Sequence, residues 1–98
     1  MAIDLSTLVK QSPAQVSTAL DEEIVILNLE NSLYFGLEGV AACIWNAIKE
    51  PTNAAEICRE VMDRFEVGEE QCRTEVLEFL EQLATAGLIE TTSPTSDQ

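Results

Sequence analysis

The chain contains no histidine, and its 5 Lys and Arg residues stand against 18 Asp and Glu residues, which gives a net charge of −13. Without histidine, neither a Ser/His/Asp nor a Cys/His catalytic pair can form, and the commonest general base is missing. The sequence also has no Gly-rich phosphate loop. The excess of carboxylates repels phosphate, which makes nucleic acid an unfavourable partner. We therefore expect a binding protein without a cofactor, and not an enzyme.

Long apolar runs and metal-binding spacings are missing as well. No segment approaches the roughly 20 apolar residues that cross a bilayer, and the N-terminus has no signal-like segment, so we expect a cytoplasmic protein without a membrane partner. The three cysteines, Cys43, Cys58 and Cys72, are too widely spaced for a zinc knuckle. Each lies on an apolar helical stripe, where a free cysteine is usually a small buried hydrophobe. We expect no metal site.

The 98 residues are enough for one domain with one hydrophobic core. Residues 1–14 mix polar and apolar positions without a period, and Ser12-Pro13 interrupts any local helix, which predicts a flexible N-terminal arm. Residues 15–90 form the predicted domain. Residues 91–98 are rich in Ser, Thr and Pro, which predicts a disordered tail.

Strands are predicted at three places in the first half of the domain. Residues 15–20 alternate in polarity, residues 24–29 form a continuous apolar run broken only by Asn28, and residues 33–37 return as a third strand. Short polar turns separate the three segments. Because strands that are neighbours in sequence usually pair, we expect a three-stranded antiparallel meander.

Three helices are predicted to follow. The first covers residues 39–49 and stops before Pro51. The second is capped by Asn53, with Glu56 three residues later as in a capping box. The third opens at residues 68–70 and runs to about residue 86, where Gly87 closes it. The predicted fold class is therefore α+β and winged-helix-like, with a three-stranded antiparallel sheet followed by three helices.

The third strand and the third helix carry the signs of a binding site. Leu33, Tyr34 and Phe35 lie in an uncharged strand that is rich in apolar and aromatic residues, which is what a sheet edge offers to an incoming peptide. The core stripe of the third helix is flanked by Arg73, Leu77 and Ala84, which widen its apolar face. A wide stripe in a small domain is more often core than groove, and the two interpretations stay open at this point.

A family resemblance adds to these observations. The chain resembles the PqqD-like family over about residues 15–90, through the following segments: Leu27-Asn28-Leu29, Leu33-Tyr34-Phe35-Gly36-Leu37, Val40 to Trp45, Glu50-Pro51-Thr52, Glu56-Ile57, Phe65-Glu66-Val67, Cys72, Val76, Phe79-Leu80, Leu83 and Gly87-Leu88-Ile89. Members of that family are recognition elements that bind the leader peptides of ribosomally made, post-translationally modified peptides (RiPPs). The resemblance implies that a precursor leader pairs as a fourth strand against the third strand, with its side chains in a groove beside the third helix.

Carried onto this chain, the resemblance implies peptide-binding residues on both walls of that groove. The implied docking edge is Leu33, Tyr34 and Phe35, and the implied helical wall is Arg73, Val76, Leu77 and Leu80. The implied partners are a precursor leader peptide and the enzyme that modifies it. The first expectation is the leader peptidase or cyclase of a lasso peptide pathway. The alternatives are a radical S-adenosylmethionine enzyme, as in pyrroloquinoline quinone synthesis, or a general role in protein interaction.

Overall fold

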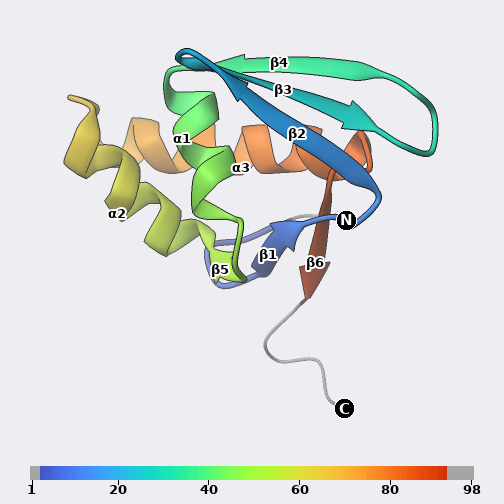
Figure 1. Cartoon of the computed structure of the whole chain (residues 1–98). Coiled ribbons are helices and arrows are strands. Elements are labelled where there is room, and N and C mark those ends of the chain that lie inside the picture. The colour runs from blue at the N-terminus through green and yellow to red at the C-terminus, as the bar shows by residue number, and fades with distance from the viewer. Residues whose placement is uncertain (1–2, 93–98) are drawn as a thin grey trace.

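The computed structural model describes residues 3–92, which form two small antiparallel sheets and three helices (Figure 1). In chain order the elements are β1 (Leu8–Gln11), β2 (Gln15–Leu20), β3 (Glu23–Asn28), β4 (Tyr34–Glu38), α1 (Val40–Ala47), β5 (Thr52–Asn53), α2 (Ala54–Arg64), α3 (Glu69–Thr85) and β6 (Ile89–Thr92). The larger sheet has the strand order β2-β3-β4 and the smaller sheet has the order β5-β1-β6. Figure 1 shows the helices between the two sheets. The predicted α+β fold is confirmed.

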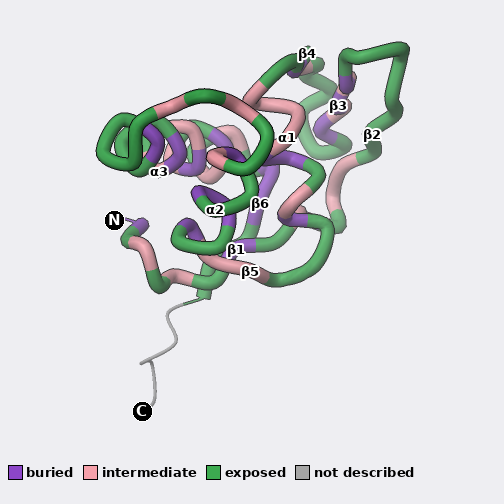
Figure 2. The backbone as a smooth tube through the Cα atoms, turned by 90° about the vertical axis from the view of Figure 1, so that its left-hand side faces the viewer, coloured by how far each residue is buried: buried purple, intermediate pink, exposed green. Residues whose placement is uncertain are grey.

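The larger sheet is the predicted meander, with β3 at its centre. Ile24 and Ile26 of β3 are buried and lie opposite Leu37 and Phe35 of β4. Since residues that lie opposite each other in an antiparallel pair point to the same face, these four side chains share the face that covers the helices. The other face is open. Figure 2 shows that β2 is exposed along most of its length.

The helix ends follow the capping signals in the sequence. The Asn53 side chain accepts a hydrogen bond from the Glu56 N–H at 2.9 Å, which satisfies one free donor at the start of α2. At the end of α3, Gly87 has φ of 76°, a conformation that glycine adopts without steric cost. The N–H of Gly87 bonds to the Ala84 carbonyl and that of Leu88 to the Leu83 carbonyl, the pattern of a Schellman cap.

The core lies where the inner face of the larger sheet meets the three helices. Trp45 and Ile48 come from α1 and the segment after it, Leu80 comes from α3, and all three are almost fully buried. Leu88 and Ile89, just beyond α3, are buried too. Within residues 3–92, no helix combines the length and the apolar composition needed to cross a lipid bilayer.

The prediction of a flexible arm over residues 1–14 is wrong for its central part. Residues 8–11 form β1, which pairs with β5 on one side and with β6 on the other. Val9 is 1% exposed and belongs to the core. At the other end of the chain, Thr91 and Thr92 belong to β6, and residues 93–98 of the predicted tail lie outside the described residues. The second sheet therefore joins segments near the two ends of the chain.

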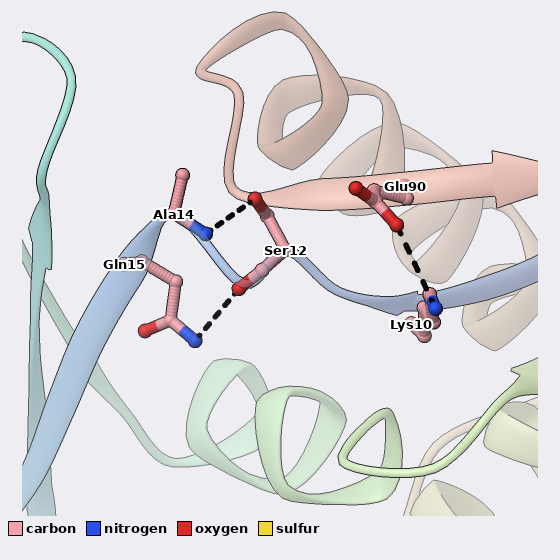
Figure 3. Close-up of polar contacts among 5 residues, drawn as sticks. All are labelled: Lys10, Ser12, Ala14, Gln15 and Glu90. Atoms are coloured by element: carbon pink, nitrogen blue, oxygen red, sulfur yellow. Dashed lines mark hydrogen bonds and ion pairs between the residues drawn. The ribbon is translucent and has the colours of Figure 1, made fainter.

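Ser12 forms the corner at which the chain leaves the smaller sheet for the larger one (Figure 3). Its hydroxyl accepts a hydrogen bond from the Ala14 N–H at 3.0 Å, and its carbonyl accepts one from the Gln15 side chain at 3.1 Å. The Ser12 N–H donates to the Leu88 carbonyl at 2.9 Å. An ion pair between Lys10 and Glu90 spans β1 and β6 beside the corner. These contacts fix the position of the smaller sheet relative to β2.

Candidate functional site

The larger sheet, as far as the structure describes it, has two unpaired edges, β2 and β4. Within residues 3–92, β4 pairs with β3 alone, so its other side offers backbone donors and acceptors to a further strand. The Asn28 N–H donates to the Leu33 carbonyl at 2.9 Å, which identifies Asn28 and Leu33 as a hydrogen-bonded pair of the ladder. Hydrogen-bonded pairs recur at every second residue of an antiparallel ladder. Phe35 and Leu37 therefore direct their backbone groups to β3.

The residues between them face the other way. Tyr34, Gly36 and Glu38 belong to the non-hydrogen-bonded pairs of the β3–β4 ladder, so their N–H and C=O groups point to the open edge. The hydrogen bonds on the other side of β3 agree with this alternation, since the Leu29 N–H bonds to the carbonyl of Ala14, the residue before β2. The sequence predicts a docking edge at this strand, but it does not indicate which residues direct their N–H and C=O groups outward.

An apolar groove runs between this edge and α3. It has a volume of about 540 Å³. Its sheet wall is formed by residues of β4, its floor includes Ala41 of α1, and its helical wall comes from the second half of α3 and the residues after it. The lining residues are Tyr34, Phe35, Gly36, Leu37, Ala41, Phe79, Gln82, Leu83, Ala86 and Leu88. Only the Gln82 amide and the Tyr34 hydroxyl bring polar side-chain atoms to this lining.

Asn28 ties the two walls of the groove together. Its side-chain amide nitrogen donates to the Ala86 carbonyl at 2.8 Å, and its amide oxygen accepts from the Glu30 N–H at 2.8 Å. The residue is 2% exposed, and both of its side-chain polar atoms are satisfied. The β3–β4 hairpin is thus held against the end of α3. This contact explains the one polar position in the apolar run of the central strand.

The predicted docking edge lies at the groove. Tyr34 and Phe35 line it, and Leu33 is the exposed residue immediately before β4. The predicted helical wall does not lie there. Val76 and Leu80 are 1% and 0% exposed and belong to the core, while Arg73 lines a separate hollow with Leu5 and Arg59.

Leu77 follows Arg73 by one turn of α3, on the face that the N-terminal segment covers. Further along the same row, the Glu81 carboxylate accepts a hydrogen bond from the Ile3 N–H at 2.6 Å. The apolar shoulder of α3 therefore packs beside the N-terminal segment and not beside β4. The helical wall of this groove is instead formed by Phe79, Gln82, Leu83 and Ala86, whose i, i+3, i+4, i+7 spacing marks one face of the helix.

The cysteines add no reactive group to this site. Cys58 and Cys72 are buried between α2 and α3, where the Cys72 Sγ lies 3.8 Å from the Cys58 carbonyl oxygen. Burial, with the neighbouring Cys72 thiol, raises the pKa of Cys58 to about 11, and burial also raises the pKa of Cys43. Because the thiolate is the nucleophile, the raised pKa values make Cys43 and Cys58 poorer nucleophiles near neutral pH. The arrangement offers backbone pairing and apolar surface, which suit peptide binding.

Comparisons with known proteins agree with the geometry. The family model of coenzyme PQQ synthesis protein D (PqqD) matches residues 23–89. A solved structure described as TbiB1 in complex with the TbiA(beta) leader peptide is similar to this chain, with 32% identity and a TM-score of 0.78, over 90% of this chain and 99% of that one.

A structure described as lasso peptide synthetase B1 complexed with the leader peptide has a TM-score of 0.75 over 84% of this chain and 96% of that one. Its identity of 17% makes it a likeness of fold. No curated protein matches the chain. The family model covers well over half of the sequence, and the chain therefore belongs to the PqqD family.

Proposed function

We propose that this protein binds the leader region of a precursor peptide by strand addition at β4 and delivers it to a modifying enzyme. The observation that carries the proposal is the open backbone edge of β4 directly beside an apolar groove. An added strand gains hydrogen bonds from such an edge and specificity from pockets for alternate side chains. Both similar solved structures are described as complexes with a leader peptide, which supports this occupant.

In this mechanism the leader bonds to the outward backbone groups of Tyr34 and Gly36. Every second leader side chain then points into the groove, between Phe35 and Leu37 on one wall and Phe79 on the other. The groove is already formed in the free protein, which lowers the ordering cost of binding. Micromolar affinity requires about 8 kcal/mol, which a few backbone bonds and buried apolar side chains can supply.

We propose the leader peptidase or cyclase of a lasso peptide pathway as the enzyme that receives the leader. The support is the 32% identity to TbiB1 over nearly the whole of both chains. The protein itself is proposed to leave the peptide chemically unchanged, because its sequence has no histidine and burial raises the pKa of the Cys58 thiol, which keeps it protonated. The place of action would be the cytoplasm, where ribosomes make the precursor.

A second candidate enzyme is a radical S-adenosylmethionine enzyme, which the family description favours through its reference to coenzyme PQQ synthesis. The leader-binding step would be the same in both pathways, and only the receiving enzyme would differ. A general interaction module would instead bind apolar strands without preference for a leader. Titration of the leader-bound protein with each enzyme encoded in the same gene cluster separates these candidates.

Calorimetry with the leader of the precursor encoded beside this protein tests the proposal. We expect one-to-one binding with micromolar or tighter affinity, and mass spectrometry should show an unaltered peptide. A scrambled peptide of the same composition serves as the control and should bind far more weakly. If no leader from its own gene cluster binds, or if the scrambled peptide binds equally well, the proposal fails.

A further inference from the structure

The positive charges of this protein lie at residue 10 and within residues 49–73, and none of these residues lines the groove. The five basic residues are Lys10, Lys49, Arg59, Arg64 and Arg73. Residues 11–48 and 74–98 contain no Lys or Arg. The first range includes the whole of the larger sheet and α1, and the second includes the second half of α3. Both walls of the groove are therefore built from segments without a positive charge.

Most of these basic side chains are already paired with carboxylates on their own surfaces. Lys10 pairs with Glu90 across the smaller sheet, and Arg59 and Arg64 pair with glutamates one turn away on α2. Arg73 pairs with Glu69 near the start of α3. None of these pairs includes a residue that lines the groove. The groove thus lies in the field of the remaining carboxylates.

Three of the remaining carboxylates lie toward one end of the groove, two of them on α3 and one, that of Glu38, on the outer face of the sheet. Glu38 ends β4, and its backbone groups lie at the open edge. Glu75 and Glu78 are exposed on α3, one turn before the lining residues Phe79 and Gln82 in the same rows of the helix. The Asn28–Ala86 hydrogen bond places the end of α3 at the β3–β4 hairpin, and Figure 1 shows α3 running opposite to β4. Glu38, Glu75 and Glu78 therefore lie toward the same end, which we name the acidic end.

The other end of the groove is mainly apolar, although the exposed Glu30 also lies in the hairpin there. Leu29, Leu33 and Tyr34 lie at the β3–β4 hairpin, and all three are more than half exposed. The groove therefore has a direction, with apolar contacts at the hairpin and negative charge at the acidic end. Complementary charge across a site favours the matching ligand and disfavours ligands of the same sign.

We propose that the groove selects peptides whose apolar residues lie next to Lys or Arg side chains, with these cations at the acidic end. This inference rests on the proposed function and specifies the class of leader that the site accepts. A second copy of the chain is a poor occupant by the same reasoning, because two molecules of net charge −13 repel each other. A ligand with carboxylates at that end would meet repulsion from three glutamates.

A library of random-sequence peptides, selected on the full chain at low salt, tests the inference without knowledge of the natural ligand. Selected peptides should be enriched in Lys and Arg over Asp and Glu, next to apolar residues. A selected basic peptide should bind about 3- to 10-fold more weakly at about 0.5 M salt than at about 0.05 M, because salt screens exposed charges. Its counterpart with Gln in place of Lys and Arg should change little with salt.

The matched variants are the double substitution Glu38→Gln with Glu78→Gln, and Asp63→Asn on the exposed surface of α2. The double variant should bind the basic peptide about 3- to 10-fold more weakly and the Gln counterpart unchanged. Asp63→Asn removes a remote negative charge and should leave both affinities within experimental error. Equal effects of the two variants, or selected peptides without basic enrichment, would overturn the inference.

The outcomes also separate this inference from the proposed function. If the leader from the same gene cluster binds with an affinity insensitive to salt and to the double variant, the function stands and the inference falls. If Phe79→Ala, a variant in the groove, weakens the binding of no peptide, the proposed function and this inference are both wrong. If sedimentation shows a dimer that Phe79→Ala dissociates, a second copy occupies the groove and the inference is overturned.

Discussion

The backbone hydrogen bond from Asn28 to Leu33 sets the phase of the β3–β4 ladder. With an N–O distance of 2.9 Å, it commits Leu33, Phe35 and Leu37 to pairing with β3. Tyr34 and Gly36 are left with outward backbone groups at the open edge. The backbone groups of neighbouring residues in β4 thus differ in role, because one set bonds to β3 and the other is free to bond a further strand.

Proline substitutions at these two neighbours should give opposite results. Phe35→Pro removes a donor to β3 and should destabilise the protein by about 3 kcal/mol or more, enough to unfold much of it. Tyr34→Pro removes a donor that faces the open edge, so the protein should stay folded but bind its leader at least about 1 kcal/mol more weakly. Thermal melts and a binding titration would check both. If both variants unfold, or if Tyr34→Pro binds normally, the assigned phase is wrong.

Truncations on α3 should separate the groove wall from the opposite shoulder. Phe79→Ala removes apolar surface from the groove and should weaken leader binding by about 1 to 2 kcal/mol. Leu77→Ala removes a side chain of similar burial on the face beside the N-terminal segment, and leader affinity should stay the same. Calorimetry on both variants, with urea melts to confirm folding, makes the comparison. A larger loss of affinity for Leu77→Ala would return the helical wall to the position predicted from the sequence.

Removal of the Asn28 side chain should loosen the two walls of the groove. Asn28→Ala leaves the partly buried Ala86 carbonyl without its partner and should lower the free energy of unfolding by about 1 to 3 kcal/mol. Asn31→Ala, in the exposed hairpin, deletes one hydrogen bond to the Leu33 N–H and should cost less than about 1 kcal/mol. Urea denaturation measures both. Equal losses would show that the contact between the hairpin and α3 contributes no more to the free energy of unfolding than the hydrogen bond within the hairpin.

Local signals in the sequence were sufficient to predict the larger sheet and the helices. The apolar run that ends at Asn28, the cap at Asn53 and the closing Gly87 each act within a few residues, so their effect can be predicted without knowledge of distant contacts. The open edge at Tyr34 was predictable for the same reason. Which residues of β4 bond to β3 depends on one contact across the hairpin, so this alternation was not predictable from local signals.

The smaller sheet depends on contacts that local patterns do not contain. β1 has four residues, and Val9 is its one buried apolar side chain. Its partners are β5, more than 40 residues away, and β6, about 80 residues away along the chain. The N-terminal segment that this sheet anchors lies beside the part of α3 that the sequence predicted as the helical wall. The wide apolar stripe on α3 faces the N-terminal segment on one side and β4 on the other, and its periodicity does not indicate which side is which.

Amide hydrogen exchange at β4, followed by NMR with and without leader peptide, is a direct test of strand addition at this edge. Strand addition predicts that the Tyr34 and Gly36 N–H groups exchange quickly in the free protein and become strongly protected when the leader of the same gene cluster is added. Phe35 and Leu37 should be protected in both states, because they already bond to β3. If the leader binds while Tyr34 and Gly36 keep their fast exchange, the peptide does not add to this edge, and the account is contradicted.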